Sequence, residues 1–548
     1  MKKHLTSFVM LAATALASSV LVGCGDDVQE LESNFENQGE AVVETTVDES
    51  CTLFSTGDDG TRTWMDIDRK FYWSEGDQIY VNTEGNKFTK TFESRLATDS
   101  RTADFVLKGV SLTEPRCSVV YIGNGMNSTD TEVSAANLKV KIEKTQTQSA
   151  WSDKAHVGLS GDCGVDEAKR DNVTGKYSFT LKHKAAYLVF QPYKALDITR
   201  TWTLMKIEII TDGTTSVAGT YPFGTGELDV ANATTTSNTV TLNCGTEGFE
   251  LVNAASRGNS VFAVIQPGTH AITIRYTIKP EVSVNHVEGA TFTIDKTIPS
   301  RPFSVNGVTT IKHALGVESY PTDLFYTWDA VNPYWYGVSS ENIPNFMGAS
   351  HDDYPTAADE RNRWFNDPIV VENKYMAQNS CKNLPNINTI SWYAMRGDPR
   401  WEKNYPWFYK GNGGAHIYTY GAWFLKWENI PEKPDGDKLN CPKDIDGIDR
   451  RLTSASERRY AYSTSQYRTG NRPSATEIDK YFFLPAMGHF EDGAIPKNAH
   501  GCYWTSSSPQ LNTKSYVFTF TYQEVSITYN NNLQRKGGRI VAPADWFK

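Results

Sequence analysis

The sequence has few of the patterns that mark a helical protein or a protein that binds nucleic acid. Long amphipathic helical patterns are scarce, whereas Gly, Thr, Asn, Ser and Tyr are plentiful, which favours a mainly β architecture. The formal net charge is −10, so the basic excess that nucleic acid selects is missing and no nucleic-acid partner is expected. A length of 548 residues is too great for one core, and about three domains are expected.

Cysteine motifs are missing as well. No C-x-x-C pair occurs, which argues against a zinc knuckle and a thioredoxin-type site. Of the eight cysteines, the seven that follow Cys24 are scattered and odd in number, unlike a disulfide scaffold. We interpret most of them as small buried hydrophobic residues. The alternative is a single bridge among Cys381, Cys441 and Cys502.

The first residues indicate export. Two lysines precede an apolar run at 8–22, which is shorter than the ~20 residues that a membrane-spanning helix needs. The run ends in LVGC at Cys24, which resembles a bacterial lipobox, and the acidic residues 25–27 are similar to surface-export signals of Bacteroidetes lipoproteins. The resemblance implies a signal peptide at 1–24 and acylation of Cys24, which would anchor the precursor in the outer membrane. No other segment is apolar enough to span a membrane.

From about residue 71 to residue 319 the chain reads as short strands and turns. Residues 272–278 alternate strictly between apolar and polar side chains, which is typical of a half-buried strand. Residues 177–183 alternate in the same way. Short strands with turn signals between them favour β-sandwiches, and about 250 residues are enough for two.

Several motifs in this part carry a family resemblance. The stretch FYWSEGDQIYV at 71–81 resembles the W-x-x-G-D-x-I-x-V opening of the fimbrillin-like proteins of Bacteroidetes. The segments 178–190, 207–219 and 264–268 follow in the expected order, so the resemblance covers roughly residues 40–315. It implies two tandem transthyretin-like β-sandwiches.

The resemblance also implies a domain order and an assembly mechanism. The sandwiches are expected at 63–170 and 171–318, after a tether and removable first strand at 25–62. A protease would cut the lipoprotein precursor after an arginine, and a donor strand from another pilin subunit would fill the groove left by the lost strand. Arg62 is the expected cleavage site and Arg69 the second candidate. The alternative is that Arg62 is a solvated turn residue and the protein keeps its lipid anchor.

The composition changes near residue 320, after which ten of the fourteen tryptophans occur, so a separate domain is expected at 319–548. Its end resembles that of a Bacteroidetes and Fibrobacter surface-domain family, of the major-paralogous type, which is related to C-type lectins and formylglycine-generating enzymes. The matching positions are Arg472, Pro473, Glu477, Leu484, Pro485, Gly488, Tyr503, Trp504, Ser506, Arg535, Gly538 and Val541. The resemblance implies an α+β C-type-lectin-like domain, with a departure at Ala542, where the family has arginine.

Local patterns in this domain predict individual elements. Ser474 and Glu477 have capping-box spacing, which predicts the start of a short helix. Tyr503 and Trp504 are expected in the core. Alternation predicts one strand at 516–522 and another at 525–529, and residues 539–542 are expected to close the sheet.

Catalytic motifs are not recognisable, and we predict neither an enzyme nor a cofactor. His416, His489 and His500 have no Ser- or Cys-based constellation in the sequence. The acidic segment 444–449 lacks EF-hand spacing, so a solvated loop is favoured over a calcium site. The WFND stretch at 364–367 departs from the W-N-D of calcium-dependent lectins, and the glycines at 411–414 indicate a turn rather than a phosphate loop.

The segment 392–427 holds five tryptophans and five tyrosines, which we interpret as loops. Exposed Trp and Tyr side chains suit carbohydrate or protein binding, because they combine a large apolar area with a polar tip. The predicted ligand-binding residues are Trp392, Tyr393, Trp401, Trp407, Tyr409, Trp423 and Trp427. The alternative is that these rings form the domain core.

These observations favour a fimbrial tip subunit and adhesin. A large domain occupies the C-terminal part and the sequence ends directly after the last expected strand, so the chain is expected to accept a donor strand but not to provide one. Its partners would be other pilin subunits and a glycan or protein of a host or bacterial surface. The alternative is a lipid-anchored surface glycan-binding protein that does not polymerise.

Overall fold

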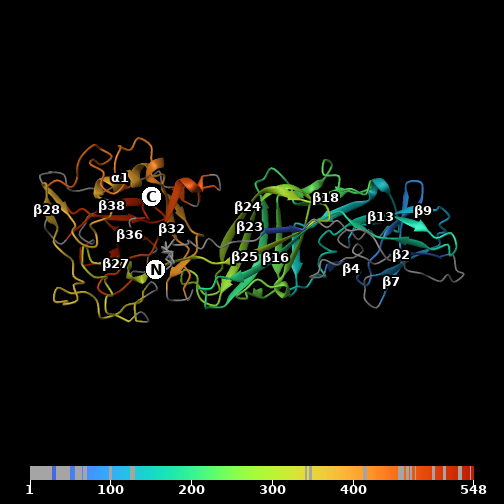
Figure 1. Cartoon of the computed structure of the whole chain (residues 1–548), viewed down its shortest axis with the longest axis horizontal. Helices are drawn as coiled ribbons and strands as arrows, with labels where there is room; N and C mark the ends of the chain where they lie inside the picture. Colours follow the sequence, from blue (N-terminus) through green and yellow to red (C-terminus); the bar gives the residue numbers. More distant parts are fainter. Residues whose placement is uncertain are drawn as a thin grey trace, which may run out of the picture.

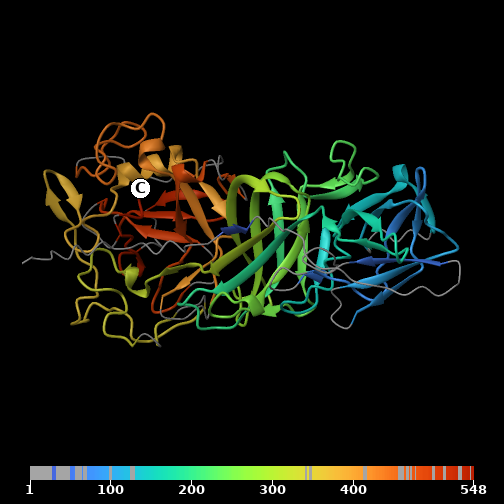
Figure 2. The ribbon, with the colours of Figure 1, turned by 45° about the vertical axis from the view of Figure 1, so that its right-hand side comes forward.

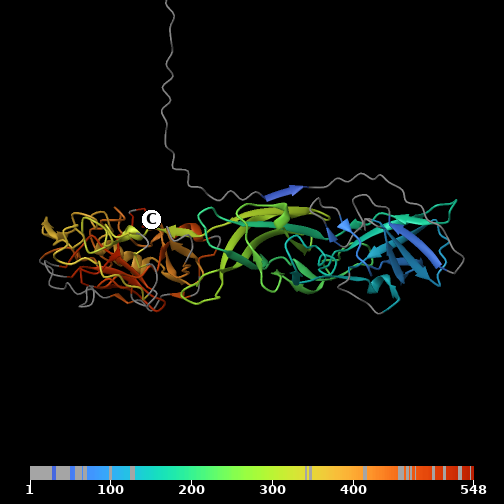
Figure 3. The ribbon, with the colours of Figure 1, turned by 90° about the horizontal axis from the view of Figure 1, so that it is seen from below.

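The protein, represented by a computed structural model, consists of three β-rich bodies in a row (Figure 1). The first sandwich and the C-terminal domain lie at opposite ends, with the second sandwich between them, and the turned views in Figure 2 and Figure 3 keep this order. The structure describes residues 28–31, 50–55, 64–65, 71–97, 102–123, 130–339, 342–344, 348–410, 416–453, 462–463, 468–469, 472–474, 477–495, 500–509, 514–528, 534–543 and 545–548.

A mainly β fold is confirmed. Over the described ranges the only α-helix is α1 (Ile387–Arg396), and the remaining regular structure is strands and single 3₁₀ turns. No helix in this part of the chain is long and apolar enough to cross a membrane.

One ten-stranded sheet forms the first sandwich, in the order β10-β6-β5-β9-β13-β14-β2-β8-β7 with β15 beside β13. The strands are β2 (Ser50–Ser55), β5 (Tyr80–Glu84), β6 (Lys87–Lys90), β7 (Glu93–Leu96), β8 (Ala103–Lys108), β9 (Arg116–Tyr121), β10 (Glu132–Ser134), β13 (Gly164–Arg170), β14 (Tyr177–Phe179) and β15 (Lys182–His183). A separate pair is formed by β3 (Trp64–Met65) and β4 (Phe71–Tyr72). Both halves of the long sheet contribute to one core, which includes Val81, Phe105, Val119 and Phe179.

Two larger sheets and a small one form the second sandwich, in the orders β1-β25-β16-β22, β12-β20-β17-β23-β24 with β21 beside β17, and β11-β18-β19. The strands are β1 (Val28–Leu31), β11 (Lys139–Ile142), β12 (Thr145–Gln148), β16 (Ala186–Lys194), β17 (Trp202–Thr211), β18 (Ala218–Pro222), β19 (Thr234–Ser237), β20 (Thr239–Cys244), β21 (Phe249–Glu250), β22 (Val261–Ile265), β23 (Gly268–Pro280), β24 (Phe292–Phe303) and β25 (Val308–Leu315). Two 3₁₀ turns are η1 (Ala135–Asn137) and η2 (Arg257–Asn259). The two larger sheets share one apolar core.

The alternation at 272–278 is confirmed on β23. Ile272, Ile274, Tyr276 and Ile278 are buried in the core between the sheets. Between them Arg275 lies on the outer face, where its Nε donates to Asp295 Oδ1 of β24 at 2.9 Å. The period-two pattern therefore correctly predicts which side chains of β23 face the core.

The chain passes between the two sandwiches more than once. β11 and β12 precede β13 in sequence but pair with β18 and β20 of the second sandwich. β13 then returns to the first sandwich and pairs with β14 through Lys169↔Ser178 and Arg170↔Tyr177. The boundary expected between residues 170 and 171 therefore falls inside the first sandwich.

The C-terminal domain contains a six-stranded sheet, β27-β39-β36-β37-β38-β33, and a four-stranded sheet, β34-β30-β32-β35. Smaller pairs are β26-β31 and the hairpin β28-β29. The strands are β26 (Glu318–Tyr320), β27 (Phe325–Tyr326), β28 (Ile369–Val371), β29 (Lys374–Met376), β30 (Arg400–Glu402), β31 (Trp407–Tyr409), β32 (Gly421–Leu425), β33 (Tyr462–Ser463), β34 (Arg468–Thr469), β35 (Tyr481–Pro485), β36 (Gly501–Trp504), β37 (Val517–Phe520), β38 (Val525–Thr528) and β39 (Arg539–Ile540). Single 3₁₀ turns are η3 (Thr322–Leu324), η4 (Trp427–Asn429) and η5 (Ile478–Lys480).

Local expectations in this domain have mixed outcomes. The Ser474 amide donates to Glu477 Oε2 at 3.3 Å, which is one of the two bonds of a capping box, but only the single turn η5 follows before Tyr481 begins β35. Tyr503 and Trp504 are fully buried core residues, as predicted. The predicted strand at 516–522 ends earlier, at Phe520, so Tyr522 is exposed.

The expected last strand is present but is not at the edge of the sheet. β39 lies between β27 and β36, with Ile540 paired to Phe325 on one side and to Tyr503 on the other. The second strand of the predicted pair is β38, in which Val525 and Ile527 are buried. Tyr529, also expected there, lies outside the described residues.

Contacts join the three bodies. The core of the second sandwich includes Tyr80 and Phe88 of the first sandwich and Phe408 and Ile417 of the C-terminal domain. Asn285, in the turn between β23 and β24, donates through Nδ2 to Thr419 Oγ1 at 2.7 Å and accepts from the Thr419 amide at 3.0 Å. The row of bodies is therefore held by packing and by hydrogen bonds across its junctions.

Candidate functional site

A strand from the N-terminal segment lies inside the first sandwich. β2 is inserted between β8, with which it is antiparallel, and β14, with which it is parallel. Leu53 stands at the centre of this arrangement, because its backbone is paired with Phe105 on one side and with Tyr177 on the other. Apart from β2, these two neighbours have no direct pairing with each other, so β2 completes the sheet at this point.

An aromatic floor lies under the position of β2. Phe105 of β8 and Phe179 of β14 come from the two flanking strands, yet their ring centroids are only 6.0 Å apart. Trp73 packs edge-on against Phe105 at 4.7 Å and against Tyr121 at 5.7 Å. All four rings are almost fully buried. We refer to the place between β8 and β14, above these rings, as the strand slot.

A second strand from the N-terminal segment lies on the second sandwich. β1 forms the edge of the sheet beside β25, antiparallel, from Val28↔Ile311 to Leu31↔Val308. Figure 1 shows it as a short blue strand against the green strands of that sandwich. The N-terminal segment thus contributes strands to both sandwiches.

The predicted processing and lipidation residues lie outside the described residues. In sequence, Arg62 falls between the end of β2 at Ser55 and the start of β3 at Trp64, and Arg69 falls between β3 and β4. A cut after either arginine would separate β1 and β2 from the rest of the chain. Cys24 precedes β1 and also lies outside the described ranges.

The seven aromatic residues predicted to bind ligand are buried. None is more than 9% exposed. They do not lie on loops, because Trp392 and Tyr393 belong to α1 and the others to β30, β31, β32 and η4. The residues in question are Trp392, Tyr393, Trp401, Trp407, Tyr409, Trp423 and Trp427.

The polar tips of several of these rings are satisfied inside the domain. The indole of Trp392 donates to the carbonyl of Lys443 at 3.1 Å, and Tyr409 Oη donates to the carbonyl of Met487 at 3.0 Å. Trp407 stacks on Tyr418 with ring centroids 4.7 Å apart. This burial corrects the expectation of exposed rings, and the alternative interpretation applies: these side chains form the core.

Tyr405, from the same segment, is more open than those seven residues. It lines a cavity of about 810 Å³ between the second sandwich and the C-terminal domain. Its hydroxyl donates to Glu318 Oε1 at 2.9 Å, and the guanidinium of Arg472 lies 5.3 Å from its ring centroid. No sequence pattern predicts this cavity, because residues from distant parts of the chain form its walls.

The acidic segment 444–449 is a loop that is exposed at residues 446–448, as expected, and two arginines that follow it bind its carboxylates. Asp444 is buried, and its Oδ2 accepts from Nε of Arg450 at 2.6 Å. Its Oδ1 accepts from the amides of Asp446 and Ile448. Asp449 likewise binds Arg451, with a shortest distance of 2.8 Å. Arginine occupies the carboxylates that a calcium ion would need.

The remaining sequence motifs have ordinary structural roles or lie outside the description. Asp367, in the stretch compared with lectins, accepts from Nη1 of Arg535 at 3.1 Å. Cys381, Cys441 and Cys502 are buried and are not bridged to one another, so the alternative of a bridge among them is wrong. The glycine turn at 411–414 lies outside the described residues.

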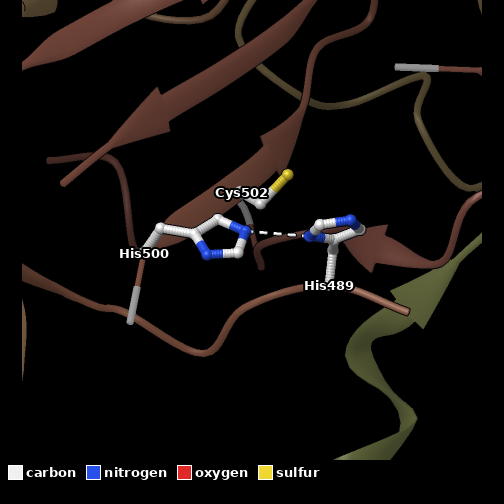
Figure 4. Close-up of side chains that lie close together, drawn as sticks. All are labelled: His489, His500 and Cys502. Carbon is white, nitrogen blue, oxygen red and sulfur yellow. Dashed lines mark hydrogen bonds between the residues drawn. The ribbon is translucent and has the colours of Figure 1, made fainter. Parts of the chain in front are cut away.

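Two histidines that looked isolated in the sequence meet a cysteine in the structure. His489 Nδ1 lies 2.8 Å from His500 Nε2, and Cys502 Sγ is beside this pair (Figure 4). Burial raises the pKa of the Cys502 thiol to about 11. The expectation that these histidines have no cysteine partner is therefore wrong. The H-x-C spacing of His500 and Cys502, which places both on one side of a strand, was the signal that could have found it.

Comparison with known proteins finds similar solved structures but does not identify a family. No protein-family model and no curated protein matches the chain. Among solved structures it is similar to a proposed cell adhesion protein from Bacteroides uniformis, with 16% identity, 49% of this chain and 94% of that one covered, and a TM-score of 0.26. A proposed cell adhesion protein from Bacteroides ovatus is 12% identical, with 49% of this chain and 98% of that one covered and a TM-score of 0.29. A fimbrial assembly protein from Parabacteroides distasonis is 11% identical, with 49% of this chain and 91% of that one covered and a TM-score of 0.25. Because each TM-score is below 0.5, no property of these proteins is transferred to this chain.

Proposed function

We propose that the chain is a fimbrial subunit that accepts the donor strand of another pilin subunit in the strand slot. The observation that supports this is the position of β2, which comes from the N-terminal segment yet completes the sheet between β8 and β14. An unfilled slot leaves backbone donors and acceptors of both neighbours unpaired and exposes the aromatic floor. An incoming strand restores both, which supplies the driving force for assembly.

Proteolysis opens the slot in this proposal. The precursor is exported as a lipoprotein acylated at Cys24, and a surface protease cuts after Arg62. The cut releases β2 together with β1, so the edge of β25 is uncovered at the same time. A donor strand fits best if apolar side chains stand opposite Phe105 and Leu107, because these two residues face the core.

The C-terminal domain is the adhesin in this proposal, and the chain is the tip subunit. The domain lies at the end of the molecule opposite the first sandwich (Figure 1), where it would point away from the subunit that donates its strand. Phe547 is buried in the domain core and the carbonyl of Lys548 accepts from Tyr393 Oη at 3.1 Å, so these residues are not available as a donor strand. The target is a glycan or a protein of another cell surface, recognised without the seven buried rings.

The N-terminus of the surface-exposed protein tests this proposal. We expect mass spectrometry to find Thr63 as the first residue of the assembled form, and the Arg62→Ala variant to lose that terminus and to remain unpolymerised. Arg69→Ala is the matched control and should process and assemble normally. If acylated Cys24 is the only N-terminus in the wild type, strand exchange is refuted and the lipid-anchored, non-polymerising protein is the better description.

A further inference from the structure

The histidine pair and Cys502 are brought together by the backbone. His489 follows Gly488, whose φ of 75° lies in the left-handed region that glycine adopts without strain, at the turn after β35. The Gly488 amide donates to the carbonyl of His500 at 2.8 Å, which fixes the two histidines side by side. His500 directly precedes β36 and Cys502 is its second residue, so their side chains project to the same side.

The facing atoms form a compact donor set. Figure 4 shows Nδ1 of His489 and Nε2 of His500 facing each other with Cys502 beside them, and one ligand atom from each of the three residues lies within 4.8 Å of the others. On the far side of the ring, Nε2 of His489 lies 3.7 Å from Glu491 Oε2. A carboxylate at the second nitrogen is the arrangement that orients a metal-bound imidazole. Cys502 is buried, whereas the two histidines are partly exposed, which leaves a path for an ion from solvent.

We propose that His489, His500 and Cys502 bind one borderline transition-metal ion of the Zn²⁺ class, with water in the fourth position. Two imidazole nitrogens and one thiolate are the ligands that such ions prefer, whereas Ca²⁺ and Mg²⁺ select oxygen ligands. Tetrahedral Zn²⁺ with Zn–N bonds of about 2.0–2.1 Å sets two nitrogens about 3.3 Å apart. The observed separation of 2.8 Å therefore has to widen by roughly half an ångström, which a rotation of partly exposed rings supplies.

Binding is a ligand exchange without any redox step. The proton shared between Nδ1 of His489 and Nε2 of His500 moves to another ring nitrogen, so both facing lone pairs become free. The Cys502 thiol releases its proton to solvent, and Sγ, Nδ1 and Nε2 each form one bond to the ion. Burial raises the pKa of the Cys502 thiol and the charge of Arg539 only partly opposes that shift, so the metal has to displace the thiol proton.

The bound ion would act as a clamp in the C-terminal domain. It joins the turn that begins at Gly488 to the start of β36, whose Tyr503 pairs with Ile540 of β39. Hydrogen bonds between the amides and carbonyls of Phe490 and Gly538 already tie the same turn to the approach of β39, at 2.7 and 2.9 Å. A metal at this place therefore stabilises the junction of the turn after Gly488, the start of β36 and the approach of β39.

Cobalt substitution on the purified full chain tests this site. We expect one Co²⁺ per chain, with a thiolate-to-cobalt charge-transfer band and the visible bands of a four-coordinate ion, all displaced by Zn²⁺. Cys502→Ser should abolish the charge-transfer band, and His489→Gln should remove at least nine-tenths of the bound metal. Glu491→Gln should weaken binding about 10–100-fold, because it removes only the carboxylate behind the ligand. His351→Gln, in the same domain but outside the cluster, is the matched control and should bind like the wild type.

Two outcomes would overturn the proposal. One is a folded wild-type chain, verified by its near-ultraviolet circular dichroism, that shows no charge-transfer band. The other is a band that survives in both Cys502→Ser and His489→Gln. If Cys502→Ser fails to fold, the partly exposed His489→Gln variant decides the matter, because its native dichroism and melting temperature without metal separate lost binding from lost structure.

Discussion

Replacement of Arg363 by leucine is expected to destabilise the C-terminal domain by about 3–5 kcal/mol, the usual cost of removing one partner of a buried charge pair. The guanidinium of Arg363 is fully buried. Its Nε donates to Asp359 Oδ2 at 2.7 Å, and its Nη1 donates to the carbonyls of Tyr334 and Asp353, each at 3.1 Å. Leucine leaves the buried Asp359 carboxylate and these carbonyls with fewer donors in a place that water does not reach easily.

Urea denaturation followed by tryptophan fluorescence measures this loss. Arg361→Leu is the matched control, because Arg361 binds the same two carboxylates but its side chain is 38% exposed. An exposed pair of this kind is worth about 1 kcal/mol or less. If Arg363→Leu lowers the free energy of unfolding no more than Arg361→Leu does, burial of the guanidinium does not decide the effect.

The same cluster predicts a pH dependence. Hydrogen bonds from Arg361, and then from Arg363, outweigh the effect of burial and hold the pKa of the Asp353 carboxyl well below its usual range. A depressed pKa means that the stabilisation is complete above the unfolded value of about 3.9 and is lost as the pH falls below it. Because the Asp353 side chain is 42% exposed, solvent screening keeps the contribution small. Denaturation at pH 3 and pH 6 should show a smaller difference in Arg361→Leu than in the wild type, and an equal difference would contradict this assignment.

The sequence predicts those features of the fold that depend only on residues within one strand. Alternation fixed the buried face of β23, and the paired apolar positions of β37 and β38 were found because period two needs no knowledge of the partner strand. The pairing of strands is not local in this sense. β11 and β12 join the second sandwich although they precede β13 in sequence, and no residue pattern in them names their partners.

α1 was missed for a related reason. The helix has only ten residues, and its polar residues Asn388, Thr389 and Ser391 are buried together with its apolar ones. Its apolar face is marked by Ile387, Ile390 and Ala394 alone, a stripe too short to stand out in the sequence. The local signal that remained was Asn386, whose side chain accepts from the amide of Thr389 at 2.8 Å as an N-cap.

The aromatic residues show the limit of composition as a guide to function. Tryptophan and tyrosine are favoured both in recognition surfaces and in cores, and their number alone does not separate the two. The structure distinguishes the two roles, because these rings have hydrogen-bond partners inside the domain. One such partner is the carbonyl of Tyr420, which accepts from the Trp407 indole at 3.0 Å. The strand slot, by contrast, needed both kinds of information: the sequence resemblance predicted a removable strand, and the topology supplied its neighbours, β8 and β14.

A chain that begins at Thr63 is expected to lose much of the stability of its first sandwich. It lacks β2, whose backbone is paired at five positions of β8, from Lys108 to Asp104, and at three positions of β14. The loss of these pairs leaves the aromatic floor uncovered. We therefore expect the melting temperature of the first thermal transition to fall by more than roughly 10 °C, because about 1 kcal/mol of stability shifts the melting temperature of a small domain by about 4–8 °C. Differential scanning calorimetry of this chain beside the full precursor measures the effect.

A synthetic peptide of residues 48–58 should restore the lost transition, because it carries β2 and can enter the slot from solution. The matched control peptide has Leu53→Pro. Leu53 is paired on both sides, with Phe105 and with Tyr177, and proline removes its amide donor from the middle of the sheet. Restoration that saturates with the first peptide and is missing with the second would show that backbone pairing fills the slot. If the shortened chain melts like the precursor, or if both peptides act alike, β2 is not the strand whose removal prepares the protein for assembly.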